Sequence, residues 1–382
     1  MRLHYFYPAN DIALAVNSPG FTPNAGAARL CATGASLPMW YGAAGDRLLA
    51  AVNNDWYVRM RDTFRLAVDV WDGNADGLEA APWGWSKVTR NVFRNAGFAD
   101  TRLPDDAALD RMRTLSNRAT GLQLAAMLRK DGLPVSAPGV AATDVRQVAD
   151  SLDRQGRSLV KQPWSTSGRG IMDSAGMSRD DLLRQAAGII RRQGSVMVEP
   201  HVDRTADFAL LFDADGGRML FRGLSLFMVD HRYCYTGNTV AGQEQQHQRL
   251  TQLVAPDILD NLITQTAAAL QTLVGDAYRG PLGVDMMVCR DDCPVAVAEV
   301  NLRNTMGRVA LELGERILAP GLTGELHLVQ SQSIEDDFTA KAARLTAGQL
   351  VLTDAAVLTG QAFVLTVSGA EESRRKSQAA PV

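Results

Sequence analysis

The sequence predicts a protein of two or three domains in which α-helices and β-strands alternate. Its 382 residues exceed the roughly 150 residues of an average domain. Hydrophobic residues make up 46% of the chain and charged residues 21%, which supplies enough apolar material for more than one core. Beyond residue 105, segments with the apolar spacing of helices alternate with short apolar segments typical of strands.

The composition argues against several functional classes. A formal net charge of -3 is unlike that of a nucleic-acid-binding protein with a broad basic surface. No apolar run approaches the ~18 residues of a membrane span, and Asn10 and Asp11 interrupt any signal-peptide pattern at the N-terminus. Four cysteines are too few for a disulfide scaffold in a chain of this length. We therefore expect a reduced, cytoplasmic protein that binds neither nucleic acid nor membranes.

Residues 1–105 should form a separate N-terminal domain. They hold five of the six tryptophans, most of which we expect in a core, and many short Gly-, Pro- and Asn-rich turns. A short apolar run such as 66–70 predicts a strand between such turns. The polar segment Pro104-Asp105-Asp106 marks the expected boundary.

The next hundred residues predict alternating helices and strands. Residues 119–130 should form a helix, because apolar residues recur at helical spacing and a glycine follows at position 132. Residues 180–192 have the same spacing. The short apolar segments 158–162 and 196–199 are expected to be strands.

Further along, segments 208–212 and 219–222 flank an Asp- and Gly-rich turn, which predicts a hairpin. Residues 256–274 form the longest predicted helix, with proline at its first position. The polar residues 371–382 are expected to be disordered.

The first candidate for chemistry is the loop that follows Lys161. The predicted strand delivers this lysine, and a segment rich in Ser and Gly comes directly afterwards, over residues 165–170. Glycines allow backbone N–H groups to approach an anion, and a lysine charge suits phosphate. A flexible surface turn has the same composition, so this alternative stays open.

The second candidate is a predicted β-hairpin. Apolar runs at 283–289 and 295–301 flank a short polar turn. If residues 291–293 form a three-residue loop, Arg290 pairs with Pro294.

Counting back along this hairpin places Asp285 directly opposite Glu299, and Asn301 lies on the same face because strand side chains alternate. A slip of one residue would scatter the three side chains. Two facing carboxylates repel unless a cation lies between them, and Mg²⁺ prefers such oxygen ligands. The alternative is a pair of solvent-facing acids, which the apolar flanking residues disfavour.

The order of these motifs resembles the ATP-grasp superfamily over roughly residues 115–318. The resemblance rests on Lys161 with its Ser/Gly loop, Glu199 after an apolar strand, Asp285, and the Glu299-Val300-Asn301 element. It implies an ATP-grasp fold, in which two α+β subdomains clamp ATP behind an N-terminal α/β domain. The implied division is 1–105 for the N-terminal domain, 106–195 for the lid subdomain, 196–345 for the subdomain with the metal site, and 346–382 for C-terminal strands and a tail.

The resemblance also implies roles for individual residues. Lys161 would contact the α- and β-phosphates, and Glu199 would lie beside the adenine amine in a hinge. The remaining nucleotide residues would be the lid-loop residues Ser167, Gly168 and Gly170, the hinge residue His201, and Asp207 on the ribose.

Asp285, Glu299 and Asn301 match the family's magnesium ligands, and Arg303 is similar to an arginine that acts on the transferred phosphate or the substrate carboxylate. Many members have a second phosphate-binding lysine where this chain has Arg118. Arginine holds phosphate with a different geometry.

The resemblance therefore implies an ATP- and Mg²⁺-dependent ligase that joins a small-molecule or peptide carboxylate to an amine. A phosphotransferase and a non-catalytic nucleotide-binding protein are the alternatives. Two further segments stay open. Residues 230–238 are either a loop that closes on substrate or a surface turn that ends at Gly237. Asn10 and Asp11 either contact substrate or cap a turn.

Overall fold

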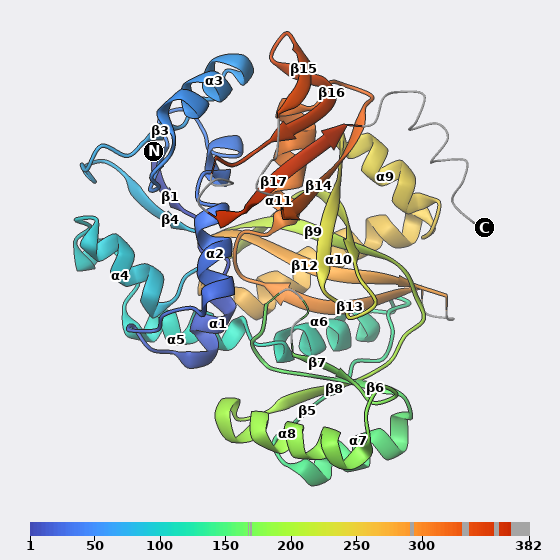
Figure 1. Cartoon of the computed structure of the whole chain (residues 1–382). Coiled ribbons are helices and arrows are strands. Elements are labelled where there is room, and N and C mark those ends of the chain that lie inside the picture. Colours follow the sequence, from blue (N-terminus) through green and yellow to red (C-terminus); the bar gives the residue numbers. More distant parts are fainter. Residues whose placement is uncertain (167, 169, 291–293, 331–335, 355–358, 368–382) are drawn as a thin grey trace.

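The computed structural model describes residues 1–382 except 167, 169, 291–293, 331–335, 355–358 and 368–382. The described chain forms three sheets, and helices lie between and around them (Figure 1). The predicted disordered tail and the predicted hairpin loop 291–293 lie outside the described residues.

The N-terminal sheet is parallel and has the strand order β3-β2-β1-β4. Its strands are β1 (Arg2–Tyr5), β2 (Arg47–Leu48), β3 (Asp69–Val70) and β4 (Glu79–Pro82). The surrounding helices are α1 (Asn10–Val16), α2 (Ala25–Thr33), α3 (Asn54–Phe64), α4 (Lys87–Asn95) and α5 (Asp106–Leu115), with 3₁₀ turns η1 (Leu37–Trp40) and η2 (Asp100–Arg102). Side-chain caps at Asn24, Asn53 and Asp105 start three of these helices.

The strand expected at 66–70 is shorter in the structure, where only Asp69–Val70 pairs with a neighbour. The residues before it follow the left-handed Arg65 that ends α3, and Val68 is buried in the core before the chain joins the sheet. The expectation that tryptophans enter the core is confirmed for Trp40 and Trp83, which are buried.

A small antiparallel sheet has the order β5-β8-β6-β7. Its strands are β5 (Val140–Ala142), β8 (Val196–Pro200), β6 (Ser158–Lys161) and β7 (Ile171–Asp173), and its helices are α7 (Val145–Gln155) and α8 (Arg179–Gln193). One face of the sheet and the apolar faces of both helices form a separate core. Figure 1 shows this unit, in green, extending away from the rest of the chain.

The central sheet is antiparallel, with the order β13-β12-β9-β10-β11-β14-β17-β16-β15. These strands are β13 (Val295–Asn301), β12 (Gly280–Cys289), β9 (Arg204–Asp215), β10 (Arg218–Val229), β11 (Tyr235–Ala241), β14 (Thr323–Gln330), β17 (Gln361–Val367), β16 (Arg344–Val351) and β15 (Asp337–Lys341). Its helices are α6 (Ala119–Lys130), α9 (Gln243–Thr251), α10 (Pro256–Val274) and α11 (Met306–Glu312), which continues into a π-helical turn, η3 (Leu313–Ile317).

The two ends of the central sheet belong to different cores. Helices α6 and α10 pack with strands β9, β10, β12 and β13 in one core. The C-terminal strands share a second core with the N-terminal domain, where Trp40 donates an indole hydrogen bond of 2.8 Å to the carbonyl of Leu352. In Figure 1 these strands, in red, lie beside the N-terminal domain, in blue. In the described part of the chain, no helix has the length and apolar character that crossing a membrane requires.

The predicted helices agree closely with the structure. Residues 119–130 and 256–274 match α6 and α10 in both bounds, and α8 extends the predicted helix 180–192 by one residue at each end. The predicted division at residue 195 falls just before β8, which pairs within the small sheet. The division at 345 falls within β16.

Candidate functional site

The β12–β13 hairpin brings two carboxylates face to face. Near its turn the pairing differs from the prediction, because Val288 pairs with Val295, one residue out of the expected register. A β-bulge lies between Met286 and Asp285 and restores the expected pairing. Asp285 is therefore opposite Glu299, as predicted.

Asn301 completes this group on the same face. Its Nδ2 donates a 2.9 Å hydrogen bond to Oδ2 of Asp285, which leaves the amide oxygen as the remaining polar atom. Burial, and then the neighbouring Glu299, raise the pKa of Asp285 from 3.8 to about 7. Within the described residues, no three His, Cys, Asp or Glu side chains gather as a metal site. A divalent ion here would depend on two carboxylates and an amide oxygen, a donor set that suits a hard cation.

Arg118 supplies a cation to this acidic group. It lies directly before α6 and is only 4% exposed. Its Nη2 donates to Oε2 of Glu299 at 3.0 Å, and its Nη1 donates to the carbonyl of Gln162 and to Oγ of Ser165, at 3.0 and 2.7 Å. Arg118 therefore joins the loop after β6 to the carboxylate on β13.

Arg303 lies two residues beyond Asn301 and pairs with a residue of the N-terminal domain. Its Nε and Nη2 donate to the carboxylate of Asp11 at 2.8 to 3.1 Å, and its Nη1 donates to the carbonyl of Asn304. Burial lowers the pKa of Arg303, but Asp11, together with Glu299 and Asp285, more than offsets this effect, so the pKa is raised overall. Asp11 is therefore an ion-pair partner, a role that neither sequence alternative had included.

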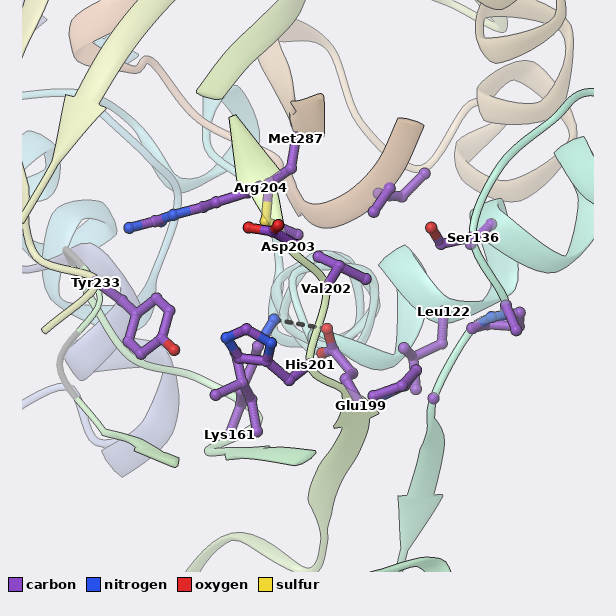
Figure 2. Close-up of a pocket in the computed structure, with 18 of the residues that line it drawn as sticks. Leu122, Ser136, Lys161, Glu199, His201, Val202, Asp203, Arg204, Tyr233 and Met287 are labelled. Carbon is purple, nitrogen blue, oxygen red and sulfur yellow. Dashed lines mark hydrogen bonds and ion pairs between the residues drawn. The ribbon is translucent and has the colours of Figure 1, made fainter. Parts of the chain in front are cut away.

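The small sheet contributes a second buried acid, Glu199. The register of β6 and β8 places Lys161 and Glu199 near each other, and Nζ of Lys161 donates to Oε2 of Glu199 at 2.6 Å. Both side chains are buried, and Oε1 of Glu199 has no hydrogen-bond partner among the described residues. Figure 2 shows this pair, with His201 nearby on the chain segment that carries Glu199.

These groups line two cavities of about 200 Å³ each. The first is lined by Lys161, Glu199 and His201, and the second by Lys161 and the acidic group on β12 and β13. Both cavities share the side chains of Leu159, Lys161, Arg204, Tyr233 and Met287. They are therefore adjoining parts of one cleft between the small and central sheets.

Asp207 faces this cleft from β9. It pairs with Met287 in register, two residues from the position opposite Asp285, so the two aspartates share a face. Burial raises the pKa of Asp207, and Arg204, at 3.5 Å, opposes this effect. Sequence reasoning had not singled out Arg204, which no local motif marks.

The loop between β6 and β7 also borders the cleft. Gly168 has a φ of +74°, and a Cβ atom there would lie 1.8 Å from the carbonyl oxygen of Tyr233. Gly170 has a φ of +83° and lies against the side chain of Gln162. Both positions therefore require glycine. Ser167, also expected in this loop, lies outside the described residues.

Residues 230–238 border the cleft as well. His231 and Tyr233 line the first cavity, and Tyr233, Tyr235 and Asn238 line the second. The alternative of a surface turn also holds in part, because residues 231–233 form a turn in which His231 and Arg232 are exposed. The turn does not reach Gly237, which lies within β11 and pairs with His327. Tyr233 also lies under the guanidinium of Arg204, 5.1 Å from its ring centroid.

Comparisons with known proteins identify the fold. No family model and no curated protein matches the chain. A solved structure of the biotin carboxylase domain of Hydrogenobacter thermophilus 2-oxoglutarate carboxylase, in complex with MgADP, ADP and bicarbonate, matches with a TM-score of 0.54 at 12% identity. The match covers 98% of this chain and 89% of that one.

Two further solved structures are similar at a TM-score of 0.50. N5-carboxyaminoimidazole synthetase from Staphylococcus aureus, complexed with ADP, is 9% identical, with 99% of this chain and 96% of that chain covered. Biotin carboxylase from Campylobacter jejuni, in a β-γ-ATP complex, is 12% identical, with 99% and 90% covered. The chain therefore has the ATP-grasp fold, as its sequence predicted.

Proposed function

We propose that this protein is an ATP- and Mg²⁺-dependent ligase that activates a carboxylate as an acylphosphate and couples it to an amine. The observation that carries the proposal is the convergence of Lys161 and the acidic group on one cleft between two sheets. Similar folds in the solved structures hold ADP or MgADP, which supports a nucleotide as the occupant of this cleft.

The first cavity suits the base of the nucleotide, and Asp207, which lines the second cavity, suits the sugar. The unpartnered Oε1 of Glu199 is an acceptor for the adenine amine, and His201 lies on the same hinge segment. Asp207 would accept hydrogen bonds from the ribose hydroxyls. Lys161 lines both cavities, so it can reach the phosphates where the two meet.

The second cavity suits the phosphates and the reacting carboxylate. Asp285, Glu299 and Asn301 would hold a magnesium ion, which when bound neutralises charge on the phosphates. Gly168 and Gly170 would cover the phosphates, and Arg118 and Arg303, which line this cavity, would add positive charge.

In the proposed reaction, a carboxylate oxygen of the substrate attacks the γ-phosphorus, and the bond to the leaving ADP oxygen breaks. The amine nitrogen then attacks the acyl carbon, and phosphate leaves with the bonding electron pair while the amine loses a proton. A cleft closed by the small sheet would keep water from the acylphosphate between these steps. No nucleophile from the protein takes part.

Calorimetric titration of ATP, with and without Mg²⁺, tests the nucleotide site. We expect Mg²⁺-dependent binding by the native protein that weakens about tenfold or more in Lys161→Ala, because a direct charge on the phosphates is lost. Lys130→Ala, at an exposed lysine near the end of α6, is the matched control and should bind normally. No binding by the native protein under either condition would exclude both ligase and phosphotransferase activity.

Product analysis then separates the two activities. A ligase releases ADP and phosphate only when carboxylate and amine pools are both supplied. A phosphotransferase yields a stable phosphorylated product without an amine.

A further inference from the structure

The backbone and the guanidinium of Arg118 are both held by hydrogen bonds. Its backbone N–H donates to the carbonyl of Pro163 at 3.0 Å, and its guanidinium is held by Gln162 and Ser165 on one side and by Glu299 on the other. With 4% of its surface exposed, it is buried between the small-sheet loop and β13. A planar guanidinium held at three points has one preferred position.

The charges of the acidic group are unequally compensated. Glu299 has Arg118 as a direct ion-pair partner, whereas Asp285 has no ion pair among the described residues and accepts a hydrogen bond from Asn301. Arg303 lies close enough to lower the pKa of Asp285, but it is paired with Asp11. Arg118 is thus the direct counter-charge of one of the two facing carboxylates, Glu299.

We propose that Arg118 is a built-in counter-cation that occupies Oε2 of Glu299 and that a divalent ion has to compete with it for this carboxylate. The inference rests on the proposed metal site and adds a role that differs from direct phosphate binding. An entering nucleotide would offer Arg118 a phosphate oxygen in place of Glu299. Glu299 would then be free to bind the metal ion. Nucleotide and metal would therefore bind with positive coupling.

Binding of Mn²⁺ alone to the full-length protein, followed by electron paramagnetic resonance, tests this proposal. We expect Arg118→Gln to bind Mn²⁺ about tenfold more tightly than the native protein, because an opposite charge beside a carboxylate changes its affinity for a cation by about this factor. Arg118→Lys keeps the charge and should remain close to the native affinity. An unchanged or weakened affinity in Arg118→Gln would overturn the proposal.

The tighter Mn²⁺ binding expected of Arg118→Gln must depend on Glu299. When Glu299→Gln is already present, adding Arg118→Gln should therefore no longer tighten Mn²⁺ binding, since the carboxylate that they compete for is gone. A gain that persists would contradict the proposed contact. General damage to the fold does not tighten metal binding, so the sign of the effect separates this role from a structural one.

Ser165→Ala provides a second test if Arg118→Gln does not fold. It removes the 2.7 Å anchor of the guanidinium but keeps its charge, and should raise Mn²⁺ affinity about threefold, the weight of one ordinary hydrogen bond. An unchanged affinity would count against the proposal. If the native protein and these variants all fail to bind Mn²⁺, the metal site and this inference both fail, whereas ATP binding measured in EDTA decides the nucleotide site separately.

Discussion

The cleft holds two pairs of charged side chains that are built in opposite ways. On the small sheet, Glu199 is paired with Lys161, and both come from neighbouring strands of one sheet. On the central sheet, Glu299 faces a second acid, Asp285, and its cation comes from Arg118, outside the sheet. One pair is compensated locally, whereas the other depends on elements far apart in the sequence.

The two pairs should therefore affect the stability of the protein and its metal binding in different ways. Removing one member of the opposite-charge pair leaves a buried charge, so it should destabilise the protein. In the like-charge pair, Asp285 is the member without an ion pair, so removing its charge should stabilise the metal-free protein while it damages the metal site. The following predictions test this contrast, starting with the largest effect.

Lys161→Met should lower the free energy of unfolding by about 3 kcal/mol, because Glu199 would remain buried without its cation. Urea unfolding followed by tryptophan fluorescence measures this change. Adding Glu199→Gln to the same variant should recover most of the loss, since the unpaired charge is then gone. If Lys161→Met alone is as stable as the native protein, the buried charge of Glu199 does not need Lys161 for its stabilisation.

Asp285→Asn should change the free energy of unfolding in the opposite direction. We expect it to raise the free energy of unfolding by roughly 1 kcal/mol at pH 8 in EDTA, because it removes a charge that is disfavoured first by burial and then by the facing Glu299. The same variant should lose the Mg²⁺ dependence of ATP binding. A loss of stability in EDTA would show that the pair is already neutralised in the native protein.

The pH dependence of stability sharpens this prediction. The folded-state pKa of Asp285 is raised from 3.8 to about 7, so between these values the folded state binds more protons than the unfolded state. Stability of the metal-free protein should therefore fall as the pH rises through this window and then level off. Asp285→Asn should flatten this part of the profile, and an identical slope in both proteins would contradict the assignment.

Gly168→Ala changes neither charged pair and tests the loop that borders the cleft. Its new Cβ would meet the carbonyl oxygen of Tyr233, and its positive φ adds strain, so we expect a loss of about 1 kcal/mol and several-fold weaker ATP binding by calorimetry. Gly132→Ala is the matched control, because Gly132 also has a positive φ, of +85°, but nothing within 4 Å of a Cβ. It should lose stability without losing affinity, and equal affinity losses in both variants would exclude the specific contact.

The sequence by itself determined the features that depend on residues close together in the chain. Helices α6 and α10 follow from apolar residues three and four positions apart, and glycines lie just beyond their ends. The shared face of Asp285 and Asn301 at neighbouring strand positions follows from side-chain alternation and hairpin pairing. The order of these motifs was enough to predict the ATP-grasp fold.

Tertiary structure decided how the charges are paired. The bulge that restores the pairing of Asp285 with Glu299 has no signal in the apolar pattern. The ion pair of Asp11 and Arg303 joins residues 292 positions apart, and that of Arg118 and Glu299 joins residues 181 positions apart. Local patterns record which face a side chain occupies. The partner of a buried charge depends instead on how separate sheets and loops pack, because a charge that leaves water is stabilised by whichever opposite charge the fold brings near it.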